Sequence, residues 1–373
     1  SNMLWRSMDQ GETWTAISED LTRSDERGDV PFGTISSFDE SDHVFGQILV
    51  GTDDGQVWLT RDGGVEWEDV SDGIVRDRWI TRALSSTHDR DRLYLTANGY
   101  RDDDMAAYVY RSDDLGDSWQ SISSGLPAEP VNVIHEDPAN PDLLYVGTDR
   151  GVYLSRDGGD SWISLNAGLP HVPVHDLVVH PRDHELVAGT HGRSVWVVDV
   201  EPIQLLDDEI EGSPLHVFAI EEVQARRGWR SKRGGWFYRA DEDESTHTYR
   251  VWASEAGPAT LEILDEEDQL LRSVDIELGR GISQLEWDLR LDPDLALAVE
   301  TARETDKADT TLAATPWAEA VRLEYPLYVT GGEYTLRVSR GEDSASASLT
   351  VKAPPGRGDR RTDPLTKPGK LHP

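Results

Sequence analysis

Short apolar strands alternate with turns rich in Gly and Asp over the first half of the chain, and segments of helical periodicity are few. One eight-residue pattern, Ser/Thr-x-Asp-x-Gly-x-x-Trp, follows such a strand four times, and its tryptophans lie 43 to 53 residues apart. That period is typical of a four-stranded propeller blade. The fixed positions of the four copies are Ser7, Asp9, Gly11 and Trp14; Thr60, Asp62, Gly64 and Trp67; Ser112, Asp114, Gly116 and Trp119; and Ser155, Asp157, Gly159 and Trp162.

The chemistry of this eight-residue box is that of a turn. The hydroxyl and the carboxylate can accept backbone N–H groups that a tight turn leaves unpaired. The Gly adopts a left-handed backbone at little cost, and the Trp covers the turn with a large aromatic area. Because the box recurs in blade after blade whereas an active site occurs once, we interpret its residues as scaffold rather than as metal ligands or catalytic acids.

The repeats divide residues 1–207 into four blade-length units and a leading half-blade. The units span 31–72, 77–124, 128–167 and 173–207, and the half-blade spans 4–18. A propeller closes its ring, because an open end leaves an edge strand and a bare apolar face. Three closures remain open from the sequence. Further blades precede this chain, the strand-like segment 215–220 completes the half-blade, or two chains associate and form a homo-oligomer.

Beyond residue 207 the pattern changes. We expect a connector at 208–240, then an immunoglobulin-like β-sandwich at 241–353 that carries a polar insertion at about 292–322, and a flexible tail at 354–373. The connector holds a basic aromatic cluster, which we interpret as docking on acidic surface rather than as a sugar or anion site. Its members are Arg226, Arg227, Trp229, Arg230, Lys232, Arg233, Trp236, Phe237 and Tyr238.

Composition adds a strong acidic bias to this all-β pattern. The 373 residues include 71 Asp and Glu against 36 Lys and Arg, for a net charge of −35, and there is no cysteine. Acidic excess with few lysines is typical of proteins from high salt, where screening weakens the repulsion between carboxylates. The charge argues against nucleic acid as a partner. The missing cysteine excludes thiol nucleophiles and disulfides, and no apolar run reaches the length of a membrane helix.

Three long stretches resemble a known group of proteins. These are NGYRDDDMAAYVYRSDDLGDSW, EDPANPDLLYVGTDRGVYLSRDGGDSW and GLPHVPVHDLVVHP with LVAGTHGRSVWVVDVEPIQLL. They resemble bacterial BNR/Asp-box proteins of the sortilin-like (VPS10-type) or glycosyl-hydrolase-like group, and GISQLEWDLR and GEYTLRVS resemble the sandwich that follows the propeller there. The resemblance covers about 31–352 and implies an all-β fold: a β-propeller followed by an immunoglobulin-like β-sandwich. Members of the group are usually longer, with more blades upstream.

The Asp box also occurs in glycosidases, whose activity requires a defined set of catalytic residues. The Arg-Ile-Pro motif of sialidases is absent, and the nearest candidate entry strand reads Asp29-Val30-Pro31-Phe32-Gly33. Glucanase-type propellers use a pair of carboxylates across a cleft, and 71 acidic residues do not single out one pair. The sequence identifies no catalytic residue.

Departures from the repeat are where a repeat protein carries its binding residues. The first departure is the insertion at 98–104, with Tyr100, Arg101, Asp102, Asp103 and Asp104 as candidates for binding a sugar or calcium, although we favour a solvated acidic loop. The second is the turn containing His191 and Arg193, which are candidates for facing the central channel unless the turn only closes the last blade. We interpret His171, His175, His180 and His184 as a sequence cluster without a metal site.

Two hypotheses follow. The first is a binding or scaffold propeller that recognises protein or glycan, without a cofactor and exported or held at the cell envelope of a halophilic bacterium, although no signal peptide is visible from Ser1 onward. The alternative is a glycoside hydrolase of the Asp-box type that acts through a carboxylate pair in the propeller cleft.

Overall fold

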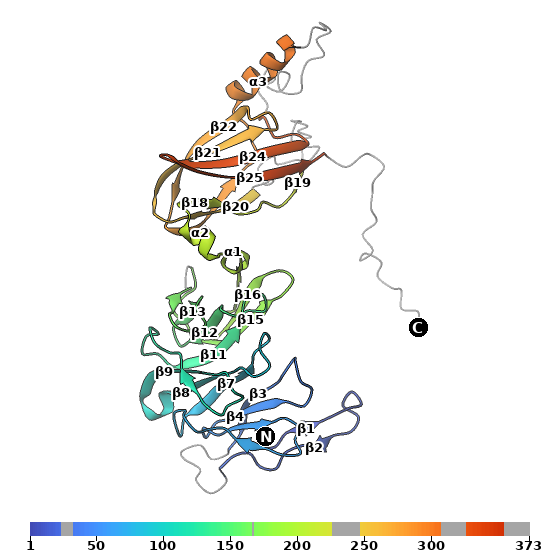
Figure 1. Cartoon of the computed structure of the whole chain (residues 1–373), viewed down its shortest axis with the longest axis vertical. Helices are drawn as coiled ribbons and strands as arrows, with labels where there is room; N and C mark the ends of the chain where they lie inside the picture. Colours follow the sequence, from blue (N-terminus) through green and yellow to red (C-terminus); the bar gives the residue numbers. More distant parts are fainter. Residues whose placement is uncertain (24–32, 166–167, 226–246, 307–325, 354–373) are drawn as a thin grey trace. The chain divides into compact units, whose positions relative to one another are not determined.

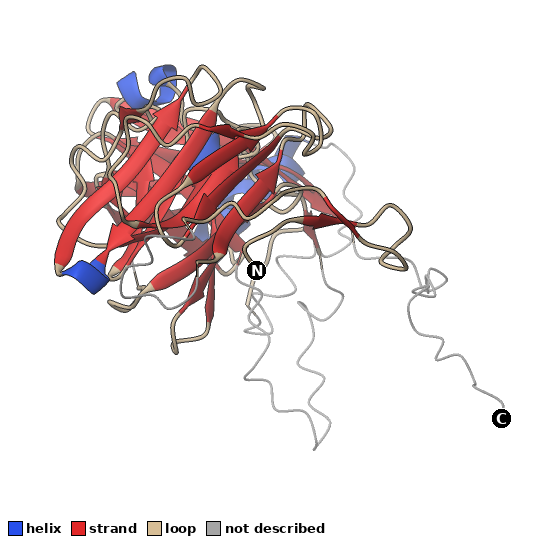
Figure 2. Ribbon diagram, turned by 90° about the horizontal axis from the view of Figure 1, so that it is seen from below, coloured by secondary structure: helices blue, strands red, loops and turns tan. Residues whose placement is uncertain are grey.

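The computed structural model describes residues 1–23, 33–165, 168–225, 247–306 and 326–353. The chain divides into two compact units, 1–204 and 205–373. In the described residues of both units, most of the regular secondary structure is β-strand (Figures 1 and 2).

The first unit contains three complete blades, each a four-stranded antiparallel sheet with its strands in sequence order. Their strands are β3 (Ile35–Glu40), β4 (Ile48–Thr52), β5 (Val57–Thr60) and β6 (Glu68–Asp69); β7 (Trp79–Ser85), β8 (Leu93–Gly99), β9 (Asp104–Ser112) and β10 (Gln120–Ser121); and β11 (Val131–Glu136), β12 (Leu144–Thr148), β13 (Gly151–Ser155) and β14 (Ile163–Ser164). We call these sheets the first, second and third blades. A short 3₁₀ turn, η1 (Tyr100–Asp102), lies between β8 and β9.

An incomplete sheet lies at each end of this series. The leading hairpin consists of β1 (Trp5–Arg6) and β2 (Thr15–Ala16). The end sheet consists of β15 (Val174–His180), β16 (Glu185–Thr190) and β17 (Val195–Asp199). The predicted fourth blade therefore has three strands in the described part of the chain, because its third strand is not followed by an Asp box.

The apolar core lies between neighbouring sheets. Each adjacent pair of sheets, from the leading hairpin to the end sheet, encloses its own cluster of buried side chains. Strands in the blade interiors are apolar on both faces: β4 and β12 are buried at every position. Each blade is therefore stabilised chiefly by the blades before and after it, as in other repeat proteins.

The structure excludes one of the three predicted ways of closing the propeller ring. Segment 215–220 does not complete the leading half-blade, because β18 (Leu215–Val217) pairs with β20 (His247–Ala253) in the second unit. The predicted connector is also wrong as a separate segment. It contains β18 and β19 (Val223–Gln224), and β19 pairs with β25 (Asp343–Lys352). The sheets of the second unit thus begin at Leu215 rather than at about residue 241.

The second unit is a sandwich of two sheets around one core. One sheet has the order β18-β20-β23 and the other β19-β25-β24-β21-β22. Its remaining strands are β21 (Gly257–Asp265), β22 (Leu270–Leu278), β23 (Gly281–Trp287) and β24 (Gly332–Arg340). The described part of the predicted insertion forms α3 (Pro293–Asp306), and two short helices, α1 (Glu201–Gln204) and α2 (Asp208–Gly212), precede the sandwich. The immunoglobulin-like type of the sandwich stays a prediction.

Candidate functional site

Each Asp box forms a closed network of hydrogen bonds within its own turn. In the last box the Gly159 N–H donates to Ser155 Oγ at 2.8 Å, and the Ser161 N–H donates to Asp157 Oδ1 at 2.8 Å. The Ser155 hydroxyl donates to the same Asp157 oxygen. The box glycines all have positive φ, from 87° to 101°. The other three boxes repeat these bonds, so the carboxylate oxygens serve the turn itself.

The electrostatics of the boxes agree with this role. Hydrogen bonds from the Thr13 side chain and backbone lower the pKa of Asp9 to about 2. The pKa values of Asp62, Asp114 and Asp157 are lowered as well. These carboxylates are held ionised as acceptors, which is the opposite of what a general acid requires.

The Trp of each internal box joins two blades, a role that the sequence did not reveal. The indole N–H donates to a backbone carbonyl just after the last strand of the preceding sheet, at 2.7 to 2.8 Å. The donor and acceptor pairs are Trp67 with Ile17, Trp119 with Val70, and Trp162 with Ile122. A Cβ on the box glycine would clash with the same preceding residue in all three cases.

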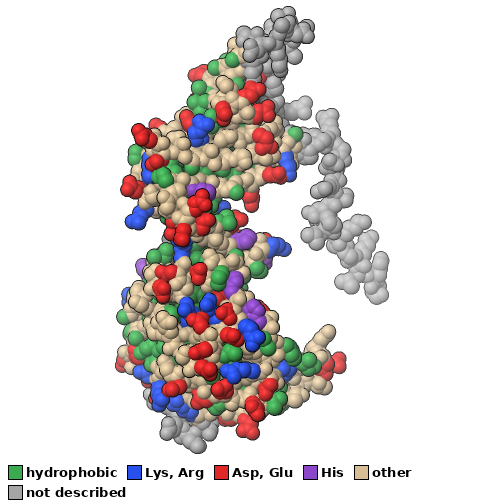
Figure 3. All heavy atoms as spheres, viewed as in Figure 1, with side chains coloured by type: hydrophobic (Ala, Val, Ile, Leu, Met, Phe, Trp, Pro, Cys, Tyr) green, Lys and Arg blue, Asp and Glu red, His purple; other side chains and the backbone are tan. Residues whose placement is uncertain are grey.

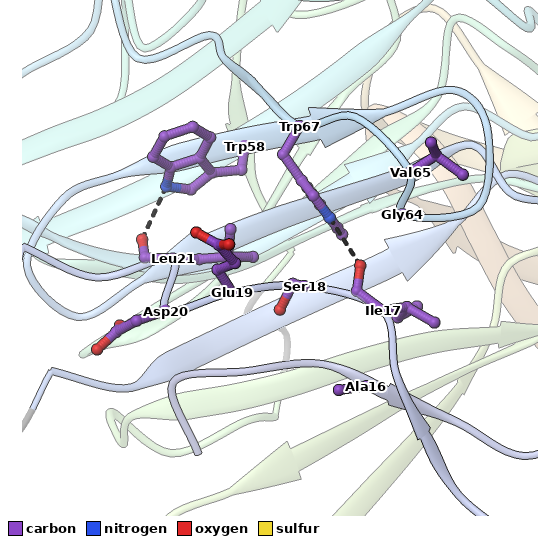
Figure 4. A pocket seen from close by; sticks show the side chains of 10 residues that line it. All are labelled: Ala16, Ile17, Ser18, Glu19, Asp20, Leu21, Trp58, Gly64, Val65 and Trp67. Atoms are coloured by element: carbon purple, nitrogen blue, oxygen red, sulfur yellow. Dashed lines mark hydrogen bonds between the residues drawn. The ribbon is translucent and has the colours of Figure 1, made fainter.

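The first of these joints borders a groove of about 490 Å³ (Figure 4). Trp67 and Trp58 lie on one side, and their N–H groups reach the carbonyls of Ile17 and Leu21. The remaining lining comes from residues 16–21 and from the box turn. The groove therefore follows a seam between sheets and is lined by residues that already hold those sheets together.

The insertion at 98–104 differs from the other turns in both shape and partners. Asp103 takes a left-handed backbone with φ 55° after η1. The Arg78 side chain lies 2.9 Å from Asp104 and 3.5 Å from Asp102, and the Tyr108 hydroxyl donates to Asp104 at 2.8 Å. These hydrogen bonds lower the pKa of Asp104. Two of the three acidic side chains are thus held by cationic or hydroxyl partners of the same blade.

Tyr100 and Arg101 are exposed on the insertion, as are Asp102 and Asp103. The Arg101 guanidinium lies 4.6 Å from the Trp79 ring centre and 5.7 Å from that of Tyr100. Tyr100 is 43% exposed. In the same blade, Trp79 Nε1 and Asn98 Oδ1 are buried and have no hydrogen-bond partner among the described residues. A buried donor and a buried acceptor on paired positions of β7 and β8 are thus both unsatisfied.

The second candidate turn brings two histidines together. The His191 ring contacts the His175 ring edge to face, with centres 5.5 Å apart. The Arg193 carbonyl accepts a hydrogen bond from the Trp196 indole at 2.9 Å, while its side chain is exposed. The loop 98–104 and this turn occupy the same place in their sheets, between the second and third strands.

His175 belongs to a polar column that the repeat pattern could have revealed. The first strand of every blade and of the end sheet has a β-bulge at the same place. The residues in the bulges are Ser36, Thr81, Asn132 and His175. The residues at the end of the second strands are Asp53, Asn98, Asp149 and His191. Aligning the four repeats position by position would have marked both columns, because polar residues interrupt apolar strands there.

Some of these polar residues connect neighbouring blades. Asn98 Nδ2 donates to Asn132 Oδ1 at 3.1 Å, and Asn132 Nδ2 donates to Asp149 Oδ1 at 3.0 Å. These two hydrogen bonds connect Asn98 of the second blade, through Asn132, to Asp149 of the third blade. The end of the blades that carries both candidate loops is therefore polar and linked from sheet to sheet.

The inner strands carry two side chains that bridge blades. Asp39 on β3 accepts from the Ser85 N–H at 2.8 Å, and His135 Nε2 on β11 accepts from the Val179 N–H at 3.1 Å. Burial raises the pKa of Asp39 and lowers that of His135 to about 4. A raised pKa is typical of a catalytic acid. Because His135 makes the same bridge at the equivalent position, we interpret Asp39 as structural.

The structure offers no metal centre in its described parts. No group of three or more His, Asp or Glu side chains lies close enough there to hold an ion. In loop 98–104 both Asp104 oxygens already accept hydrogen bonds, Oδ2 from Arg78 and Tyr108 and Oδ1 from the Ala106 N–H. Of the clustered histidines, His184 Nδ1 lies 2.7 Å from Gln204 Oε1 and His180 lies 3.3 Å from Asp183. The basic aromatic cluster at 226–238 falls outside the described residues.

The fold and the boxes together define an all-β repeat protein whose propeller-type blades are joined by Asp boxes. No protein-family model matches the chain, and no curated protein does. No helix in the described ranges is long and apolar enough to span a membrane. On the face shown in Figure 3, acidic side chains are spread over both units with basic ones among them.

Several solved structures are similar at low identity. A GH74 xyloglucanase from Xanthomonas campestris is 19% identical with a TM-score of 0.39, over 53% of this chain and 33% of that one. An ancestral GH74 enzyme is 16% identical with a TM-score of 0.41, over 73% and 35%. YCF48 bound to a D1 peptide is 13% identical with a TM-score of 0.37, over 52% and 56%. The chain thus spans about a third of the GH74 enzymes and about half of YCF48. Likenesses of this degree assign no activity or partner.

Proposed function

We propose that this chain is a binding protein that recognises protein or glycan through the blade end carrying loop 98–104 and the His191 turn. The observation that supports this most directly is the stack of Arg101 on Trp79 in an insertion that exposes Tyr100. Rigid aromatic surfaces combined with arginine are enriched at protein interfaces. The site stands on a rigid sheet, since Asn98 is bonded to the third blade.

The unsatisfied pair in the same blade adds a reason for a ligand. A sugar hydroxyl, a peptide group or a water both donates and accepts, so groups of this kind are able to satisfy Trp79 Nε1 and Asn98 Oδ1. A ligand that stacks on Tyr100 keeps the cation–π contact of Arg101 with Trp79 and adds these hydrogen bonds.

The hydrolase alternative has less support. The Asp-box carboxylates are held ionised within their turns, and Asp39 bridges two blades. We expect no turnover of aryl-glycosides or polysaccharides in low or molar salt. Release of reducing sugar that disappears on substituting one cleft carboxylate would establish the hydrolase instead. The acidic surface supports the further proposal that the protein works in saline, extracellular surroundings.

The test is a screen of a glycan array and a displayed peptide library, followed by affinity measurements on variants. We expect Tyr100→Ala and Arg101→Ala to weaken binding of the best ligand by at least about tenfold, because a stacked cation–aromatic contact contributes about 1–2 kcal/mol. As a matched control, Asp157→Ala should lower stability by about 1–3 kcal/mol through unpaired turn donors and leave binding unchanged where the fold persists. Equal affinity of Tyr100→Ala and wild type would contradict the proposal.

A further inference from the structure

Two buried amide side chains join the second and third blades in a chain of hydrogen bonds that has a direction. Asn98 Nδ2 donates to Asn132 Oδ1 at 3.1 Å, and Asn132 Nδ2 donates to Asp149 Oδ1 at 3.0 Å. Asn98 is 4% exposed and Asn132 is 6% exposed. Each lies at a β-bulge, Asn98 between β8 and β9 and Asn132 between β11 and β12. We call Asn98, Asn132 and Asp149 the amide relay.

The direction of the amide relay is set at Asp149. A carboxylate only accepts hydrogen bonds, whereas an amide presents either its oxygen or its NH₂ group. Asp149 therefore turns the Asn132 NH₂ group toward itself and the Asn132 oxygen toward Asn98. That oxygen takes the Asn98 NH₂ group, which leaves Asn98 Oδ1 for another partner. The orientation of an amide follows from such partners, and here the deciding partner of Asn98 lies on the third blade.

The acceptor that the relay leaves over is not used within the blade. Asn98 Oδ1 receives no hydrogen bond from the described residues. At the same place in the first blade, both oxygens of Asp53 accept from Thr34, at 2.7 and 2.8 Å. Trp79, which pairs with Asn98 across β7 and β8, has a buried Nε1 donor that also lacks a partner there. Because buried polar groups are normally satisfied, this donor and acceptor indicate a missing partner.

The chemistry of the pair restricts what completes it. The missing group donates to Asn98 Oδ1 and accepts from Trp79 Nε1, and a hydroxyl does both. A carboxylate only accepts and an ammonium group only donates, so neither serves both atoms. Asp102 and Asp103 are exposed on the neighbouring insertion, and their charges repel an anion. The pair therefore favours a neutral ligand that carries hydroxyl groups.

The surroundings fit a sugar ring better than a protein surface. Tyr100 is 43% exposed and presents an aromatic face at the start of the insertion. One face of a sugar ring carries C–H groups that pack on such a surface, while its hydroxyls point outward from the ring. A stable protein contact buries about 800 Å² on each partner, whereas the features described here are one aromatic face and one donor–acceptor pair. This small footprint matches one or a few sugar rings.

We propose that the ligand at this blade end is a neutral sugar and that Asp149 is a positioning residue that selects a donating hydroxyl through Asn132 and Asn98. The inference rests on the proposed function, because it assigns a ligand class to the same site. Asn98 Oδ1 and Trp79 Nε1 are buried in the free protein, so the η1 turn shifts when the sugar binds.

An array of neutral oligosaccharides with their deoxyfluoro analogues tests the selection on the whole chain. Fluorine does not donate, so replacing the hydroxyl that donates to Asn98 should weaken binding by at least about tenfold. Asp149→Asn should reduce this difference to within about threefold, because an amide at position 149 either donates or accepts and no longer fixes the relay. Asp160→Asn is the matched control, since it makes the same charge change at an exposed turn of the third blade.

A second substitution distinguishes positioning from a merely structural role. Asn98→Asp combined with Asp149→Asn keeps the net charge and places a carboxylate at position 98, which accepts in either orientation. Discrimination against the fluorinated sugar should therefore return to within about threefold of wild type. A structural role for Asp149 predicts no such return. Thermal melts establish that each variant is folded.

Nuclear magnetic resonance tests the relay without any sugar. Asp149→Asn should shift the side-chain amide signals of Asn98 and Asn132, whereas Asp160→Asn should leave them unchanged. Amide signals that Asp149→Asn does not move would overturn the relay, whatever the protein binds.

The outcomes of the array separate this inference from the proposed function. Equal binding of a sugar and all of its fluorinated analogues by wild type would overturn the selection and leave the proposed function standing. Binding of displayed peptides but of no sugar would overturn the sugar and again leave the proposed function standing. Absence of any ligand in both collections would overturn both.

Discussion

The third blade and the end sheet differ far more in burial than in sequence pattern. Both begin with a bulged strand, and their second and third strands pair in the same register. Leu154 in the third blade is 2% exposed, whereas Val197 at the same position of the end sheet is 56% exposed. The third blade also has a fourth strand and an Asp box. The strand pattern therefore builds a sheet, while burial depends on whether another sheet follows.

The Asp box does more than close its own turn. Within a turn it satisfies backbone donors, but through its Trp and Gly it also fixes the distance to the preceding sheet. Stability in stacked repeats is carried by contacts between nearest neighbours. Substitutions at matched positions of internal and end sheets should thus show how much of the unfolding free energy comes from packing against a neighbouring sheet and how much from the strand itself.

The largest difference is expected at the paired apolar positions. Leu154→Ala should lower the free energy of unfolding by about 2–5 kcal/mol, because it leaves a cavity between two sheets. Val197→Ala should change it by less than about 1 kcal/mol, as for other exposed sites. Urea denaturation of dilute protein in low salt measures both. Equal losses would show that Val197 is covered in solution.

A second difference concerns pH, because His135 of the third blade corresponds to Val178 of the end sheet. Burial lowers the pKa of His135 to about 4, from 6.5, and its Nε2 must stay unprotonated to accept the Val179 N–H. Between these values the unfolded chain binds a proton that the folded chain does not. Stability should therefore fall by about 3 kcal/mol as the pH drops from 6.5 to 4, and this contribution should be flat below 4.

The control for this effect is His135→Gln, whose amide oxygen keeps the acceptor and does not titrate. The difference in unfolding free energy between wild type and variant, measured across this pH range, isolates the histidine from the many carboxylates. A difference that does not change with pH would show that His135 titrates normally in the folded protein.

The smallest difference is expected at the box tryptophans. Trp162→Phe should cost about 1–3 kcal/mol, because the Ile122 carbonyl loses its donor in a buried seam. Trp14→Phe should cost less than about 0.5 kcal/mol, since Trp14 is exposed and bonds only to its own turn. Differential scanning calorimetry at low protein concentration compares the two. A large loss of stability in Trp14→Phe would indicate that Trp14 is covered in solution.

Much of the fold was predictable because it depends on local patterns. The four boxes, with Gly11 and its equivalents, marked every hairpin between third and fourth strands, and alternating apolar positions marked the strands around them. The candidate loop at 98–104 was found because it interrupts a repeat. The Arg101 stack on Trp79 was not found, since Trp79 lies on a different strand from the loop and sequence spacing does not encode that contact.

Other features depended on pairing between distant strands. Segment 215–220 has a strand pattern that suits either unit, and only its pairing with β20 assigned it to the sandwich. The fourth repeat has the length of a blade but forms three strands in the described residues. It has no Asp box, which in the other repeats forms the hairpin between the third and fourth strands.

By itself, the sequence determined the hairpins and the order of the blades, since both rest on bonds between residues close in the chain, and it predicted that the box carboxylates are structural. Only the tertiary structure decided which faces are covered. Val197 and Leu154 occupy the same position in their strands. They differ in burial because the end sheet packs on Leu154, whereas no described sheet of the first unit packs on Val197. The physical reason is that burial is a property of pairs of surfaces, and a single repeat carries only one of them.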